Sequence, residues 1–141
     1  MPATLSIPAT HESLSQVPQW LAGLKHQHGW SRRSLFILQL ALEELLVNTL
    51  DYGYRQARNV RSPNDHQIVL SVTTTPNDIV LTIQDDGAAF DPTQHTLQPL
   101  AASLDEANVG GQGLRLIRHY FDEIHYRRDA DHNHLRLKLT R

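Results

Sequence analysis

Alternation of apolar and polar residues in five short segments predicts five strands. These segments are 4–8, Gln67–Thr75, Asp78–Gln84, Glu123–Arg128 and Leu135–Thr140. Apolar residues at helical spacing predict helices over about Glu12–Gln27, from Ser31 to about Arg55, and after the glycines at 110, 111 and 113. The order of these elements is typical of an α+β sandwich, in which helices cover one face of a mixed sheet.

The helix that begins after Ser31 has no purely polar face. A helix that is apolar on most sides is buried between other elements. Glu44 and Asn48 interrupt its apolar surface and lie one turn apart on the same side, whereas Glu43 faces about 100° away. Such a pair is either bonded to nearby backbone or water, or it serves a ligand. In the second case Asn48 would give an oxygen to Mg²⁺ and Glu44 would accept a proton.

A carboxylate ends the third predicted strand. The period of two places Asp85 on the core-facing side of that strand, in the row of Ile79, Leu81 and Ile83. The following Asp86 and Gly87 are ordinary turn residues, and Asp86 is expected to face solvent. Residues 91–109 show little periodicity, which is typical of a functional lid or of a disordered stretch.

Glycines 110, 111 and 113 directly precede a helix that contains Leu114. Exposed amides and the positive end of a helix dipole suit phosphate oxygens, although a plain loop-to-helix junction also uses glycine. The spacing fits neither the dinucleotide-binding fingerprint nor the P-loop.

Three segments together resemble a known family: Glu44–Asn48, Asp85–Pro92 and Gly110–Leu114. They are similar to the N, G1 and G2 boxes of the Bergerat-type ATP-binding fold, a two-layer α/β sandwich with a mixed, mostly antiparallel sheet. Histidine kinases, type II topoisomerases, Hsp90 chaperones and anti-sigma-factor serine kinases share this fold. The spacing and the Phe-Asp-Pro after the second box look most like the last group. The resemblance covers nearly the whole chain, as one domain of residues 1–141 with a lid over about 92–109.

The resemblance also implies roles for single residues. Glu44 would be the catalytic base, and Asn48 would hold Mg²⁺. Asp85 would accept a hydrogen bond from the adenine amino group, and Gly87 would let the backbone approach the base. The remaining ATP-binding positions implied by the resemblance are Phe90, Gly110, Gly111, Gly113 and Leu114.

The function implied by the resemblance is that of an ATP-dependent serine/threonine kinase in a partner-switching system. Such a kinase acts as an anti-sigma factor, phosphorylates a small STAS-type antagonist, and is commonly a homodimer. A histidine kinase would need a phospho-accepting histidine on a separate helix pair, and a topoisomerase-type ATPase would need a transducer domain. We expect neither in a chain of 141 residues that the ATP-binding domain fills, so the serine/threonine kinases are the better match. An adaptor that holds ATP but transfers nothing is the alternative, against which the presence of Glu44 argues. Tyr52-Gly53 and Gln112 depart from common family residues. Neither departure removes a metal or base ligand, and the identity of the partner stays open.

The composition of the chain argues against several classes of protein. With 141 residues, 40% hydrophobic and 20% charged, the chain is expected to form one globular domain. The net charge of −2 gives no electrostatic case for nucleic-acid binding. The absence of cysteine excludes disulfides and thiolate chemistry. No run of 18 apolar residues and no apolar leader are present, so we expect a cytoplasmic protein without a membrane segment.

Overall fold

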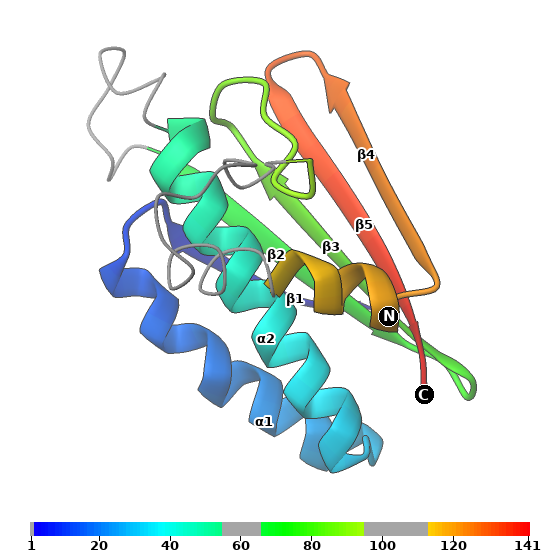
Figure 1. The fold of residues 1–141 in the computed structure, drawn as a ribbon. Helices are drawn as coiled ribbons and strands as arrows, with labels where there is room; N and C mark the ends of the chain where they lie inside the picture. Colours follow the sequence, from blue (N-terminus) through cyan, green and yellow to red (C-terminus); the bar gives the residue numbers. More distant parts are fainter. Residues whose placement is uncertain (1, 55–65, 95–112) are drawn as a thin grey trace, which may run out of the picture.

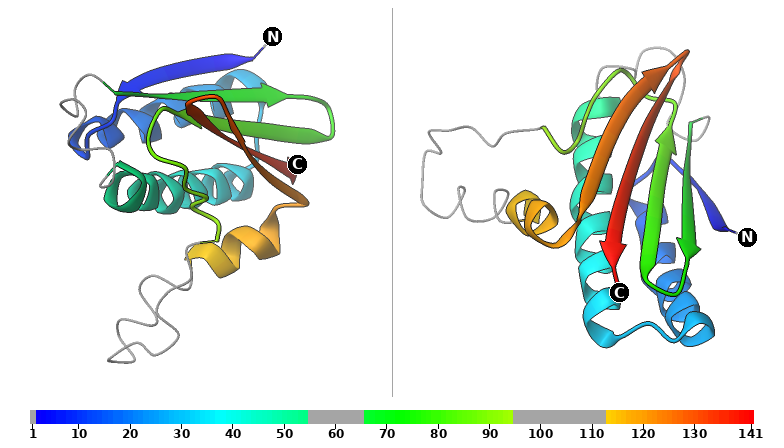
Figure 2. Two further views of the ribbon diagram at one scale, coloured as in Figure 1. Left: turned by 90° about the horizontal axis from the view of Figure 1, so that it is seen from above. Right: turned by 90° about the vertical axis from the view of Figure 1, so that its right-hand side faces the viewer.

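The fold has two layers, a five-stranded sheet and a layer of helices that covers one of its faces (Figures 1 and 2). It comes from a computed structural model, which describes residues 2–54, 66–94 and 113–141. The predicted α+β sandwich is therefore confirmed. Most of the predicted lid, with Gly110 and Gly111, lies outside the described residues.

The strands follow the alternating segments of the sequence. They are β1 (Ala3–Pro8), β2 (Gln67–Thr74), β3 (Asp78–Asp85), β4 (Glu123–Asp129) and β5 (His132–Thr140). Their order in the sheet is β1-β2-β3-β5-β4, and each neighbouring pair is antiparallel. The strand β5 begins three residues before the predicted segment, which brings Asn133 opposite Asp85.

The first helix of the chain is divided in two. A 3₁₀ turn, η1 (Glu12–Ser15), leads into α1 (Gln16–His28). Pro18 is the third residue of α1, within the first turn, where the backbone N–H groups have no intrahelical partner and proline is tolerated. Gly29 ends α1 with a φ of 69°, a left-handed conformation that suits glycine.

The long helix changes from α-helical to π-helical directly after Asn48, the predicted metal ligand. Helix α2 (Arg32–Asn48) is capped at its N-terminus by Ser31, whose Oγ accepts a hydrogen bond from Ser34 N at 3.0 Å. A π-helical turn, η2 (Thr49–Gly53), follows directly, and Tyr54 N donates to Thr49 O five residues earlier. The predicted helix to about Arg55 is thus continuous as far as Tyr54, the last described residue of this segment, but its type changes from Thr49 onward. Such π turns are frequent at functional sites.

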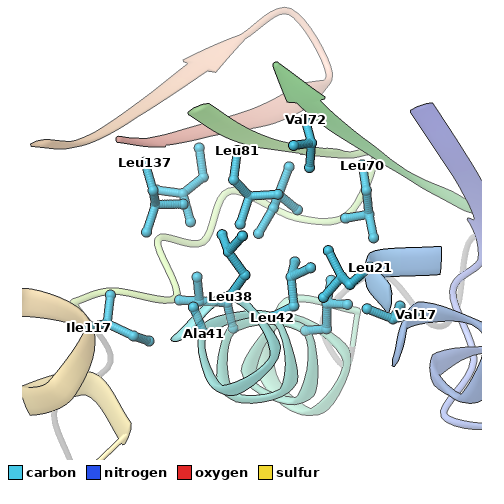
Figure 3. Close-up of a cluster of buried hydrophobic side chains, with 14 of the residues drawn as sticks. Val17, Leu21, Leu38, Ala41, Leu42, Leu70, Val72, Leu81, Ile117 and Leu137 are labelled. Atoms are coloured by element: carbon cyan, nitrogen blue, oxygen red, sulfur yellow. The ribbon is translucent and has the colours of Figure 1, made fainter. Parts of the chain in front are cut away.

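The core lies between the sheet and the helices. Residues 113–120 form a further helix on the same face of the sheet as α1 and α2. Figure 3 shows side chains of the helices and of the strands gathered in this core, and the labelled residues are Val17, Leu21, Leu38, Ala41, Leu42, Leu70, Val72, Leu81, Ile117 and Leu137. Helix α2 contributes the most to this layer, as its apolar surface predicted.

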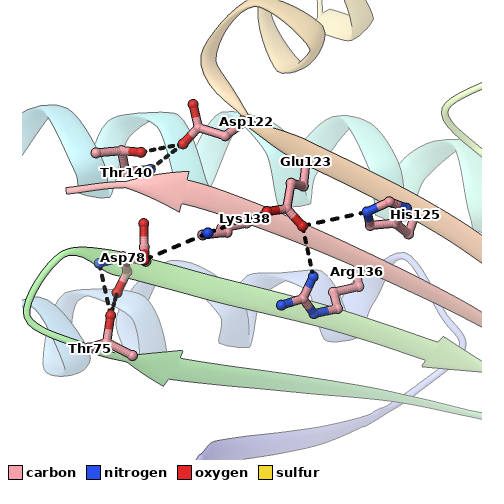
Figure 4. A network of polar contacts seen from close by, with 8 residues as sticks. All are labelled: Thr75, Asp78, Asp122, Glu123, His125, Arg136, Lys138 and Thr140. Atoms are coloured by element: carbon pink, nitrogen blue, oxygen red, sulfur yellow. Dashed lines mark hydrogen bonds and ion pairs between the residues drawn. The ribbon is translucent and has the colours of Figure 1, made fainter.

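The opposite face of the sheet carries polar residues at the C-terminal strands (Figure 4). Glu123 lies 3.3 Å from both Lys138 Nζ and Arg136 Nη1, and 3.5 Å from His125 Nε2. Exposed pairs of this kind contribute little to stability. They lie on the solvated face of β4 and β5.

No helix in the described part of the chain has the length and apolar character needed to cross a bilayer.

Candidate functional site

The two acidic residues of α2 lie in different environments. Glu43 is exposed, whereas Glu44 is half-buried on the side of the helix that also carries the buried Asn48. Burial, with a smaller contribution from Glu43, raises the pKa of Glu44 above 4.5. A carboxylate with a raised pKa is the better proton acceptor near neutral pH. The choice of Glu44 over Glu43 is therefore consistent with its surroundings.

Gly113 lies directly against the side chain of Glu44. A Cβ atom at position 113 would lie 2.6 Å from Glu44 Cδ, 2.8 Å from Cγ and 2.9 Å from Oε2. Only glycine allows this approach without displacing the carboxylate. The contact brings the end of the glycine-rich segment, and the helix that follows it, to the C-terminal part of α2.

Asn48 lies where α2 meets the segment after β3. Its side chain is 8% exposed, and its Nδ2 lies 3.5 Å from Pro92 O, a long hydrogen bond. The amide nitrogen is thus turned toward residue 92, and the amide oxygen is the atom that a hard cation would use.

Asp85 is buried at the exit of β3, with 4% of its surface exposed. Its Oδ1 accepts hydrogen bonds from Gly87 N at 3.0 Å and from Asn133 Nδ2 at 2.8 Å. Burial is the largest influence on this carboxyl and raises its pKa, against the effect of the hydrogen bonds from Asn133 and Gly87. The prediction that Asp85 continues the core-facing row is confirmed.

Asn133 is a member of the site that the sequence analysis did not single out. It is 3% exposed, and besides Asp85 its Nδ2 donates to Ala88 O at 2.8 Å. Its Oδ1 accepts from Phe90 N at 3.3 Å and from the Tyr126 hydroxyl. The signal was present in the alternation of β5, where Asn133 precedes Leu135, Leu137 and Leu139 on the core-facing side.

Asp86 does not simply face solvent, as had been expected. Its Oδ1 accepts a hydrogen bond from the Tyr54 hydroxyl at 2.6 Å and lies 3.2 Å from Nδ1 of the buried His66. Burial would raise the pKa of Asp86, but the hydrogen bond from Tyr54 and the proximity of His66 lower it. The expectation was wrong because Tyr54 and His66, distant in sequence, cover this side chain.

Phe90 packs against the turn that follows Asn48. Its ring centroid lies 6.1 Å from that of Tyr52, and a Cβ on Gly53 would lie 3.5 Å from its Cδ2. Asp91 then caps the following turn, since its Oδ1 accepts from Thr93 N at 2.9 Å and from Thr93 Oγ1 at 2.6 Å. The first residues of the predicted lid are thus attached to the domain, and Arg118 adds a hydrogen bond to Thr93 O.

Among the described residues, parts of the three boxes lie close to one side of α2. Glu44 contacts Gly113 of the third box, and Asn48 approaches Pro92 of the second. Leu114 is buried in the core, so its contact with a nucleotide stays a prediction.

Comparison with known proteins gives the family. The sequence profile of the histidine kinase-like ATPase domain matches residues 7–139. The chain belongs to this family. It is 36% identical over 134 residues to the serine/threonine-protein kinase BtrW of Bordetella bronchiseptica, covering 95% of this chain and 90% of that protein. It is also 25% identical over 125 residues to the serine-protein kinase RsbW of Bacillus licheniformis, covering 87% and 76%.

Solved structures support the same histidine kinase-like ATPase fold. The RsbU and RsbW domains of Rv1364c from Mycobacterium tuberculosis align with a TM-score of 0.64 and 16% identity, over all of this chain and 33% of that one. The SiaB-SiaC complex from Pseudomonas aeruginosa aligns with a TM-score of 0.61 and 13% identity, over 99% of this chain and 89% of that one. At these identities the likeness shows the fold alone.

Proposed function

We propose that the protein is an ATP-dependent serine/threonine protein kinase of a partner-switching system. It acts as an anti-sigma factor and phosphorylates a small STAS-type antagonist. The observation that carries the proposal is the contact of Gly113 with the half-buried carboxylate of Glu44, one helical turn before Asn48. Membership of the histidine kinase-like ATPase family and the kinase names of its relatives BtrW and RsbW support it.

The adenine end of ATP is assigned to Asp85 and Gly87. With Asp85 Oδ1 committed to Gly87 and Asn133, the orientation of the carboxylate is fixed, and its second oxygen is the acceptor proposed for the adenine amino group. Phe90 lies beside this end of the site. Gly110, Gly111 and Gly113 are assigned to the phosphates, where backbone amides at a helix start suit anions.

Mg²⁺ fits the chemistry of the residues around Asn48. The described residues contain no group of three His, Cys, Asp or Glu side chains that could hold a metal ion alone. Mg²⁺ takes oxygen ligands and is usually held by few protein groups together with waters and substrate phosphates, so the amide oxygen of Asn48 would be one of its ligands. The metal would supply charge neutralisation on the phosphates, and Asn48 would hold it.

In the proposed reaction Glu44 accepts the proton from the hydroxyl group of a serine or threonine on the partner. The hydroxyl oxygen forms a bond to the γ-phosphorus, the bond from that phosphorus to the β–γ bridging oxygen breaks, and ADP leaves. Catalysis comes mostly from positioning and charge neutralisation. The raised pKa of Glu44 favours its role as the base.

Glu44→Gln tests the kinase assignment, because glutamine keeps the shape and hydrogen bonding of the side chain but removes its basicity. ATP affinity should stay within a few-fold, and phosphoryl transfer to the antagonist should fall by about 10²–10⁴. Transfer is measured with labelled ATP and candidate small antagonist proteins, and Glu43→Gln is the matched control, expected to act like the parent. A parent chain that binds an antagonist but never phosphorylates it would instead be an ATP-holding adaptor.

The proposal includes a homodimer, a sigma factor as second partner and a cytoplasmic location, where ATP is available.

For the dimer, β1 is an edge strand without any charged side chain, whereas the other edge, β4, carries Glu123, Arg127, Arg128 and Asp129. Charged residues protect an edge against pairing, so β1 is the edge that a second copy would join. Thr4→Lys should shift the dimer toward monomer in light scattering, whereas Ser71→Lys on the inner strand β2 should not.

A further inference from the structure

Tyr54 joins the end of the helix that carries Glu44 and Asn48 to the turn that carries Asp85. Its hydroxyl donates to Asp86 Oδ1 at 2.6 Å and accepts a hydrogen bond from Asp86 N at 3.1 Å. A Cβ on Gly87 would lie 3.4 Å from two atoms of its ring. One side chain therefore contacts both residues that follow Asp85.

The contact is partly buried and includes a charge. Tyr54 is 9% exposed and His66 is 4% exposed, and their rings meet edge to face with centroids 5.1 Å apart. The carboxylate of Asp86 lies close to both, with Oδ1 3.2 Å from His66 Nδ1 as well. Hydrogen bonds to an ionised group are roughly twice as strong as neutral ones, so this is a firm attachment for an otherwise ordinary turn.

We propose that Tyr54 is a positioning residue for the adenine base, acting through Asp86 on the backbone of residues 85–87. That backbone sets where Asp85 and Gly87 meet the base. Since Tyr54 follows directly on the π turn after Asn48, it also fixes the distance between the adenine end and the metal end of the nucleotide. The inference rests on the proposed nucleotide site and assigns it a determinant of base selectivity.

A purely structural role would give a different result from a positioning role. If Tyr54 only stabilised the fold, its loss would weaken the binding of every nucleotide by the same factor. If it positions the adenine-recognising turn, its loss weakens ATP selectively. The ratio of ATP to GTP affinity separates the two roles, whatever happens to the melting temperature.

The experiment uses Tyr54→Phe in the full chain, with ATP and GTP competing against fluorescent ADP in the presence of Mg²⁺. ATP affinity should fall about tenfold, while GTP affinity changes by less than about twofold. Tyr120→Phe is the matched control, because it removes a hydroxyl from another partly buried tyrosine that contacts Arg33 and not the 85–87 turn. That variant should keep the parent's ATP to GTP ratio.

A double-mutant cycle with Asp86→Ala tests the route of the effect. Tyr54→Phe and Asp86→Ala combined should lose no more selectivity than the stronger single variant, since both remove the hydrogen bond between the Tyr54 hydroxyl and Asp86 Oδ1. Additive losses would overturn the inference, as would an unchanged ATP to GTP ratio in Tyr54→Phe. Either result would leave the kinase assignment intact, provided that the parent chain binds ATP. A parent that binds no nucleotide would overturn both.

Discussion

At the scale of single residues, the proposed site includes a close contact between Gly113 and the side chain of Glu44. Gly113 faces the carboxyl group of Glu44 so closely that even a methyl group would collide with Cδ, Cγ and Oε2. A glycine at a helix start is usually explained by backbone freedom. Here the reason is the space needed by a side chain from another helix.

Gly113→Ala should therefore displace the base. Transfer should fall by about 10² or more, because the carboxylate moves from its position. Glu44→Asp is shorter by one methylene, so the double variant Glu44→Asp with Gly113→Ala should melt at a higher temperature than Gly113→Ala alone. Equal melting temperatures of these two variants would show that the contact does not strain the alanine variant.

Asp85 illustrates a conflict between binding and stability. Because burial raises its pKa, the ionised form of Asp85 is less favoured in the folded protein than in the unfolded chain. Asp85→Asn should raise the free energy of unfolding by about 1 kcal/mol while abolishing adenine selectivity. Urea denaturation measures the gain.

The pH dependence of this gain has a definite sign. As the pH rises from the ordinary value of 3.8 through the raised pKa of Asp85, the unfolded chain loses its proton first and the parent loses stability. The advantage of Asp85→Asn should thus be absent below pH 3.8 and complete above the folded pKa. An advantage that is constant with pH would contradict this explanation.

The sequence predicted some of these residues and missed others for physical reasons. Glu44, Asn48 and Asp85 were recognisable because a carboxylate or amide within an apolar pattern requires a partner. Tyr54 and His66 were not, because a tyrosine or histidine at the edge of a loop is unremarkable until another segment covers it. Asp86 was placed wrongly for the same reason.

At the scale of elements, α2 shows how far local rules reach. Its start was predicted by the capping residue Ser31, and its burial by its apolar surface, both of which are local properties. The π turn at Thr49–Gly53 was not predicted, because it depends on a hydrogen bond five residues back and on packing of Gly53 against Phe90. Those contacts form only when the segment after β3 is in place.

The capping role of Ser31 gives a prediction for this helix. Ser31→Ala should lower the free energy of unfolding by about 1 kcal/mol, because Ser34 N loses its acceptor. The control is Ser15→Ala at the start of α1, where no side-chain capping hydrogen bond is present and a smaller effect is expected. Chemical denaturation of both variants measures the difference.

At the scale of the whole molecule, the sheet separates two chemically different surfaces. The proposed site lies on the side of α2, and the polar network of Glu123 lies on the opposite face of the sheet (Figure 4). The element order and the one-sided helix layer followed from the sequence. The conformation of the lid stays a prediction, since residues 95–112 lie outside the described part.

Nucleotide binding should stabilise the whole domain, because ligands bound to the folded state alone raise its melting temperature. ATP with Mg²⁺ should raise it by several degrees, and EDTA should remove most of that increase. In Asn48→Ala the melting temperature with ATP should no longer respond to EDTA, because the proposed metal ligand is missing. A full EDTA response in Asn48→Ala would assign the metal to other residues.

The π turn has a consequence for how the chain can evolve by changes of length. A π turn holds one more residue than an α-helical turn of the same span. The chain can therefore lose one residue between Thr49 and Gly53 and close an ordinary α-helical turn over the same span, with Glu44, Asn48 and Tyr54 left in place. A residue lost between Glu44 and Asn48, in the α-helical part, would instead turn Glu44 by about 100° around the helix axis relative to Asn48. One lost codon would then be tolerated in the π turn but would separate the base from the metal ligand in the helix before it.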